Sequence, residues 1–207
     1  EKVVTFEDGY EVTLRNPKFE LTQYGFTDLG QIHASTRLSP RVANAMIGLG
    51  LVENISEENI LSYADPDDEN NDGISGKANY VWNVIEEKLT LGRFGWKAGQ
   101  PSLRQQSAGA FNGDMGLTTS LFPVENCTEP QVSVCADLPN GINAGDQVEV
   151  DDQDLDFVEH YTQHLAVPAR RNIADENVVR GGILFDEAGC PACHIPEFKT
   201  ENNPNAP

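Results

Sequence analysis

Apolar and polar residues alternate at the start of the chain, a pattern of period two that predicts paired β-strands. An apolar run at 3–6 is followed by Asp8-Gly9 and then by alternation through Leu14. Asp-Gly between two such runs is typical of a two-residue hairpin turn. Residues 3–14 are therefore predicted to form a β-hairpin that is closed by a tight primed turn.

Helical patterns begin after an irregular stretch at 15–38. Ser39-Pro40 is typical of a helix start, because Ser accepts backbone hydrogen bonds at the N-cap and Pro fits the first helical position. Apolar residues then share one helical face, and Gly48 or Gly50 is expected to end this helix. Ser56 is predicted to cap a second short helix.

The second half of the chain contains three more segments with helical signals, at 101–111, 153–166 and 175–187. The middle helix should turn Leu155, Val158 and Leu165 inward, and Pro168 should stop it because proline breaks the helical hydrogen-bond pattern. A turn-rich stretch at 123–150 is expected to be a long surface loop.

These segments predict a mainly α-helical fold with irregular loops and a small N-terminal β-hairpin. Its 207 residues suffice for one domain or two small ones. We divide it into residues 1–150, with the hairpin, helices and loops, and residues 151–207, whose helices lead to a cysteine motif. A polar tail ends the chain soon after His194, so this second part is expected to be a truncated domain.

Acidic residues dominate the charge of the chain. It carries 33 Asp and Glu against 14 Lys and Arg, a net charge of −19. A field of this sign repels phosphate backbones, which excludes nucleic acid as a partner and favours basic proteins or small cations. No apolar run is long enough to span a membrane.

The strongest chemical signal is Cys190-Pro-Ala-Cys193-His194. C-x-x-C-H is the attachment pattern of haem c, in which two thiols bond to one haem and the adjacent His ligates the iron. Two alternatives stay open. A thioredoxin-like dithiol should follow a buried strand and open a helix, and a zinc site needs two further ligands.

An acidic loop at 65–76 resembles the first half of an EF-hand calcium loop. Gly73 stands at the sixth position, where the chain must turn sharply. Asn79 replaces the bidentate Glu of the twelfth position, so calcium would need a further ligand such as Asp65. The alternative is a solvated acidic turn. Oxygen ligands stand at the first, third and fifth positions, namely Asp68, Asn70 and Asp72.

Three further features are candidates for structure or chemistry. Cys127 and Cys135 lie close in a turn-rich stretch and are expected to form a structural disulfide. Met115, in a polar turn, is the candidate sixth ligand of a haem iron, whereas Met46 lies on an apolar face. Candidate partners for a haem propionate are Arg93, Lys97, Arg170, Arg171 and Arg180, with ordinary ion pairing as the alternative.

Four segments of the sequence resemble the bacterial di-haem oxidoreductases, a peroxidase-like family also called thiol oxidoreductases. The resemblance covers about residues 10–200. It is carried by the acidic loop, by Leu91-Gly-Arg-Phe-Gly-Trp-Lys-Ala98, by Ala110-Phe-x-x-Asp114-Met-Gly116 through Cys127, and by Leu165-Ala-x-Pro-Ala-Arg-Arg171 leading into Gly189-Cys-Pro-Ala-Cys-His194.

The resemblance implies relatives of bacterial cytochrome c peroxidases, with cytochrome c-like haem domains and calcium between them. Family members carry two C-x-x-C-H sites, whereas this sequence has only the later one. The chain is therefore expected to be an internal piece of a longer protein, inactive by itself. In the related peroxidases the second haem is the electron-entry site, which would place Cys190, Cys193 and His194 in electron transfer.

The sequence thus predicts a periplasmic fragment of a di-haem, peroxidase-like enzyme that transfers electrons through covalent haem c. A basic cytochrome or cupredoxin is the expected donor, and a peroxide is the expected oxidant. Haem is expected to be absent from protein made without the attachment machinery. Two alternatives remain: a thiol–disulfide oxidoreductase that uses Cys190 and Cys193, and a non-catalytic calcium-binding module.

Overall fold

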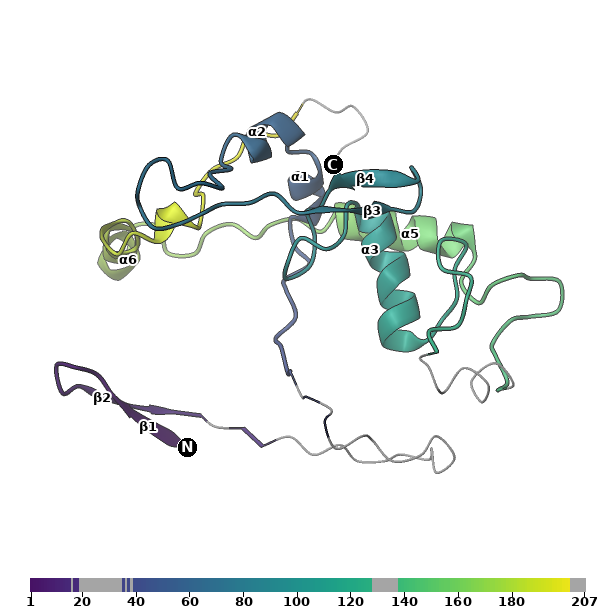
Figure 1. The fold of residues 1–207 in the computed structure, drawn as a ribbon, viewed down its shortest axis with the longest axis horizontal. Coiled ribbons are helices and arrows are strands. Elements are labelled where there is room, and N and C mark those ends of the chain that lie inside the picture. Colours follow the sequence, from purple (N-terminus) through teal and green to yellow (C-terminus); the bar gives the residue numbers. More distant parts are fainter. Residues whose placement is uncertain (16, 19–34, 36, 38, 128–137, 202–207) are drawn as a thin grey trace. The chain divides into compact units, whose positions relative to one another are not determined.

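The computed structural model describes residues 1–15, 17, 18, 35, 37, 39–127 and 138–201. It separates into two compact units, Glu1–Ala43 and Asn44–Pro207, which are treated individually (Figure 1). The described residues contain five α-helices and two antiparallel hairpins, so the fold is helix-rich with small sheets. The predicted division at residue 150 stays a prediction.

The first unit contains the predicted N-terminal hairpin. Strand β1 (Lys2–Thr5) pairs antiparallel with β2 (Glu11–Leu14). The prediction of a tight primed turn was wrong, because the strands are joined by a longer loop. The Phe6 N–H donates to Tyr10 O (2.8 Å), and the Gly9 N–H donates to Phe6 O (2.9 Å). Within this loop, positive φ is found only at Gly9 (+83°), which fits a type I turn followed by a glycine bulge.

The second unit begins with two short helices. Helix α1 (Leu49–Glu53) starts at Gly48, where the sequence pattern predicted a helix end. Residues 39–46 are irregular, because this stretch is exposed (83% at Val42) and lacks the packing that stabilises a short helix. Helix α2 (Glu57–Leu61) confirms its predicted cap, since Ser56 Oγ accepts the Asn59 N–H at 3.1 Å.

A second hairpin, absent from the sequence prediction, follows the acidic loop. Strand β3 (Tyr80–Asn83) pairs antiparallel with β4 (Lys88–Leu91). The buried Gln105 joins it to the next helix: Oε1 accepts the Val84 N–H (2.9 Å) and Nε2 donates to Trp82 O (3.0 Å). A two-stranded hairpin is marginal alone, so this side chain contributes to holding it in place.

The core of the unit lies where α3 meets α5. Helix α3 (Leu103–Ala110) continues into a π-helical turn, η2 (Phe111–Met115). Ser102 caps α3, because its Oγ accepts the Gln105 N–H (3.2 Å). Leu103 is fully buried, and the other buried hydrophobic residues are Ile55, Leu91, Phe94, Ala108, Val150 and Leu155.

Helix α5 (Asp152–Gln163) packs against both α3 and α1. It buries Leu155 as predicted but ends before Pro168, and Leu165 lies beyond the helix. Arg104 on α3 neutralises its acidic face with ion pairs to Asp152, Asp156 and Glu159.

Helix α1 holds the helices together through Gly50 and Glu53. A Cβ at Gly50 would lie 2.2 Å from Gln163 O, so only glycine allows this crossing of α1 and α5. Glu53 Oε1 accepts the Leu103 N–H (2.8 Å), and its Oε2 accepts from Gln163 Nε2 (2.9 Å). One carboxylate therefore links the start of α3 to the end of α5.

The segment before α5 is fixed by Glu149. Its Oε2 accepts the Thr118 N–H (2.8 Å), and its Oε1 accepts the Gly141 N–H (2.6 Å). These backbone donors, Thr118 first, hold the pKa of Glu149 below its usual range. A parallel bridge between Thr119 and Val150 completes the contact.

The last elements are α6 (Glu176–Glu187) and a 3-10 turn, η3 (Cys190–Ala192). Helix α6 lies within the predicted range of 175–187, and Asp175 caps it by accepting the Asn177 N–H at 2.8 Å. Across the described residues, no helix has the length and apolarity needed to cross a membrane.

Replacing Gly50 with Ala should destabilise the fold by about 1–3 kcal/mol, since the new methyl group overpacks the contact of α1 with α5. Urea unfolding measures this free energy. Gly99→Ala is the control, because a Cβ there meets nothing within 4 Å. Equal stability of the two variants would contradict the close crossing.

Replacing Glu149 with Gln should flatten the acid side of the stability curve. The folded pKa of Glu149 is lowered, so its carboxylate stabilises the fold fully above the unfolded pKa. That contribution is lost as the pH falls toward the folded value. Urea unfolding at several values between about pH 6 and pH 3 tests this. An unchanged slope in Glu149→Gln would show that Glu149 is not the group responsible.

Candidate functional site

The cysteine motif follows directly on the end of α6. Gly189 adopts a left-handed conformation (φ +73°) and turns the chain from the helix into η3. The N–H groups of Cys193 (3.2 Å) and His194 (2.9 Å) both donate to Cys190 O. The turn therefore brings both cysteines and the histidine together in one tight loop of backbone.

Both thiols of the motif are free, with Cys190 half-buried and Cys193 exposed. The exposed His194 ring lies 6.3 Å, between centroids, from the ring of Phe185 on α6. None of the residues of α6 is buried. Four of its large apolar side chains are 38–52% exposed, namely Val179, Ile183, Leu184 and Phe185, whereas Val178 is half-buried.

The chain after the motif returns to the start of the second unit. Thr200 forms an antiparallel bridge with Ile55, and the Glu201 N–H donates to Asn54 O (2.8 Å). The Phe198 ring meets the Tyr63 ring edge-on, with centroids 5.4 Å apart. These contacts hold the C-terminal segment beside α2 and the acidic loop.

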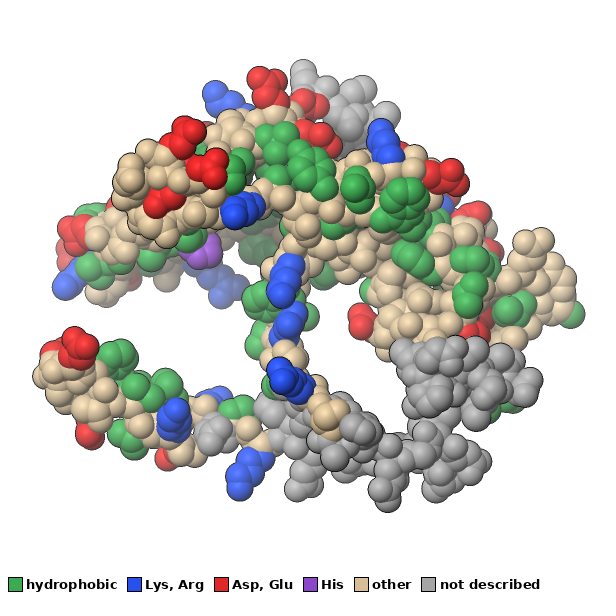
Figure 2. Space-filling view, viewed as in Figure 1, with side chains coloured by type: hydrophobic (Ala, Val, Ile, Leu, Met, Phe, Trp, Pro, Cys, Tyr) green, Lys and Arg blue, Asp and Glu red, His purple; other side chains and the backbone are tan. Residues whose placement is uncertain are grey.

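The acidic loop is folded by its own side chains. An antiparallel bridge between Asp65 and Gly76 closes its base. The Asp65 carboxylate accepts the Glu69 N–H (2.8 Å), and both oxygens of Asp68 lie 3.2 Å from the Gly73 nitrogen. Figure 2 shows Asp and Glu side chains gathered over this part of the unit.

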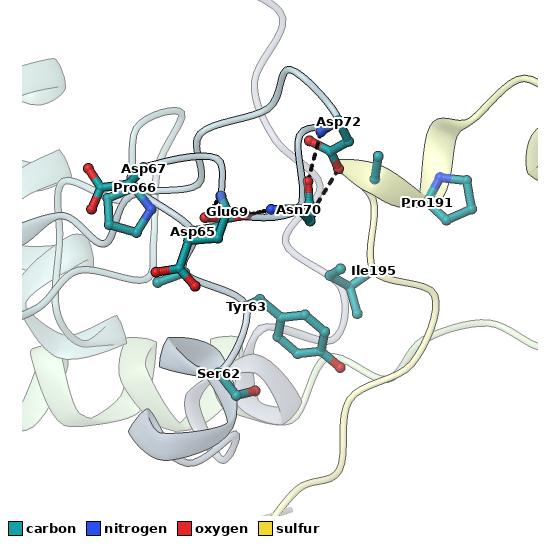
Figure 3. A pocket seen from close by; sticks show the side chains of 12 residues that line it. Ser62, Tyr63, Asp65, Pro66, Asp67, Glu69, Asn70, Asp72, Pro191 and Ile195 are labelled. Atoms are coloured by element: carbon teal, nitrogen blue, oxygen red, sulfur yellow. Dashed lines mark hydrogen bonds between the residues drawn. The ribbon is translucent and has the colours of Figure 1, made fainter.

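A pocket of about 570 Å³ lies between the acidic loop and η3. Figure 3 shows Pro191 and Ile195 on one side of it and the loop on the other, with Tyr63 below. Four carboxylates line the pocket, those of Asp65, Asp67, Glu69 and Asp72. The residues between the two cysteines thus face a strongly acidic wall.

Comparison with known proteins assigns the chain to a family. A family model described as "Di-haem oxidoreductase, putative peroxidase" matches residues 1–206, nearly the whole chain. The chain belongs to this di-haem oxidoreductase family. Searches of curated proteins and of solved structures found no match.

Haem binding by this oxidoreductase family is consistent with the residues around η3. Two free thiols and an accessible imidazole supply the chemistry of haem attachment. The exposed apolar side chains of α6 provide a surface that a flat apolar ring would cover. The preceding helix is also unlike the buried strand expected before a thioredoxin-like dithiol.

The predicted calcium ligands mostly bind backbone N–H groups of their own loop, and Asn70 Nδ2 also donates to Asp72 Oδ2 (3.2 Å). Asp72 Oδ1 accepts the Ile74 N–H (2.8 Å), and Asn70 Oδ1 accepts the Asp72 N–H (2.8 Å). Asn79 binds the carbonyls of Lys97 and Ala98 instead of the loop. Throughout the described part of the chain, no three His, Cys, Asp or Glu side chains form a group that could hold a metal ion.

The other predicted site residues lie in different surroundings. Met115 ends η2 and is 64% exposed, and η2 packs against α3 whereas η3 packs against α6. Its role as an iron ligand stays a prediction. Cys127 is disulfide-bonded, and its predicted partner Cys135 lies outside the described residues.

Arg93 has a structural role that the sequence did not reveal. Its Nη1 donates to Val52 O (3.3 Å) and Ile55 O (2.5 Å), the carbonyls at the end of α1. These bonds fix the same segment that receives Thr200. Arg93 therefore helps to position the segment that pairs with Thr200, and one nitrogen of its guanidinium is used in these two hydrogen bonds.

Proposed function

We propose that the chain is the electron-accepting part of an exported di-haem c peroxidase. Its haem would be bonded covalently to Cys190 and Cys193, and the His194 imidazole would hold the iron. The observation that carries the proposal is the C-x-x-C-H turn itself, set directly after a helix whose apolar side chains lie uncovered. Helix α6 and η3 would form the start of a cytochrome c-like haem domain.

A bound haem would supply a one-electron redox centre. The chain would contribute its position and surroundings: two thioether anchors fix the ring, the His194 imidazole holds the iron, and Phe185 packs beside that imidazole. The enzyme reaction would be reduction of a peroxide, in which hydrogen peroxide takes two electrons and two protons to give two waters. A second haem site in a longer protein would be needed for this, so the chain alone would be inactive.

The compartment and the donor follow from the same chemistry. Thioether attachment of haem takes place outside the bacterial cytoplasm, which favours a periplasmic protein. The disulfide bond of Cys127 fits an oxidising compartment. A net charge of −19 favours a basic donor such as a cytochrome or a cupredoxin.

We also propose that the acidic loop binds calcium, with Asp65, Asp68, Asn70 and Asp72 as ligands. What supports it is the closure of the loop by Asp68 onto Gly73, the first and sixth positions of the EF-hand pattern. The side chains would have to turn from their backbone partners toward the cation.

Protein made with the haem-attachment machinery should carry covalent haem with a c-type pyridine haemochrome spectrum. Cys190→Ala together with Cys193→Ala should abolish the mass increase, because no thioether can form. His194→Ala should keep the mass and change the visible spectrum. Pro191→Ala is the control, since it leaves C-x-x-C-H intact and should keep the haem.

A colourless product from the native host, with both thiols unmodified by mass, would refute the proposal. It would favour the thiol–disulfide alternative, which also predicts that the two cysteines react with a thiol reagent.

Calcium should raise the melting temperature of the chain relative to protein in a chelator. Calcium at a hundred times its dissociation constant stabilises the folded state by about 2.7 kcal/mol. Asp68→Asn with Asp72→Asn should remove the response, as it deletes two charged ligands. Identical melting of the wild type in calcium and in chelator would show that the loop is a solvated acidic turn.

A further inference from the structure

The acidic loop and the cysteine turn share one pocket, although they are far apart in the sequence. Pro191 and Ala192, the two residues between the cysteines, line this pocket together with four carboxylates. A porphyrin attached to Cys190 and Cys193 is held a few bonds from this turn. In Figure 3 Asp72 lies beside the turn that carries Pro191, and Asp67 lies toward the other end of the loop.

In the calcium-free protein, no ion pair within the described part of the chain involves these carboxylates. Its ion pairs join Lys88 to Glu86 and Arg104 to three acids of α5, and none reaches the loop. The residues that line the pocket include no Lys, Arg or His. Among the described residues, no hydrogen-bond donor contacts the carboxylate of Asp67 or of Glu69. The pocket wall therefore carries uncompensated negative charge.

We propose that, when no calcium is bound, the carboxylates of the acidic loop lower the reduction potential of the iron held by His194. Reduction adds one electron from a donor and lowers the charge of the iron site by one, with no bond made or broken. Nearby negative charge disfavours that step and stabilises the ferric form, since charge and solvent exposure are among the features that set a haem potential. This inference rests on the proposed haem site.

The test is spectroelectrochemistry of the haem-loaded protein in a calcium chelator. Asp67→Asn with Glu69→Gln removes two charges without breaking a described side-chain hydrogen bond, and should shift the midpoint potential upward. Adding Asp72→Asn should shift it further, because Asp72 lies beside the turn. The matched control is Asp146→Asn with Asp154→Asn, which removes two charges outside the pocket and should leave a smaller shift.

The salt dependence of the midpoint potential distinguishes an electrostatic effect from a change in structure. The difference between wild type and variant should shrink from low salt to about 1 M salt, where the Debye length is near 3 Å. Equal potentials for the loop variant and the control, at low salt, would overturn the inference while leaving haem attachment intact. Failure of the wild type to bind haem would instead refute the proposed function. Unchanged visible spectra in all variants confirm that the axial ligands are retained.

Discussion

A short backbone pairing between Ile55 and Thr200 is the contact on which the arrangement of the site depends. It joins the segment after α1 to the chain that follows the cysteine turn, and Tyr63 and Phe198 add an edge-on aromatic contact beside it. Arg93 fixes the same segment by binding Ile55 O. This pairing brings η3 against the acidic loop, because α6 has no buried residue of its own to hold it there.

The Asp and Glu side chains of the second unit have two kinds of surroundings. On α5, Arg104 neutralises three carboxylates at the contact with α3, so this charge stabilises the packing of helices. In the acidic loop, carboxylates accept backbone N–H groups. Among the ion pairs of the described residues, none involves this loop. Charge that contributes little to packing is thus concentrated beside the cysteine turn, which suits an electrostatic role or a cation site.

Local signals in the sequence predicted much of the fold, and long-range contacts account for the errors. Ser56 was recognised as a cap because its signal lies within a few residues. The role of the C-x-x-C-H turn stays a prediction. The helix predicted from Ser39 was wrong, since an apolar stripe without a packing partner does not hold a helix. The β3–β4 hairpin depends on the side chain of Gln105. The pocket depends on the pairing of Ile55 with Thr200. Such long-range contacts produce no periodic pattern in the sequence.

The central claim is that haem binds at the cysteine turn and lies beside the acidic loop. Nuclear magnetic resonance of the haem-loaded protein tests it, by comparing amide signals in the ferric and ferrous states. We expect the amide signals of residues 65–72 and of Phe198 to change with the oxidation state of the iron more than those of the core residues Leu103 and Leu155. Signals of the acidic loop that stay the same in both states would contradict it.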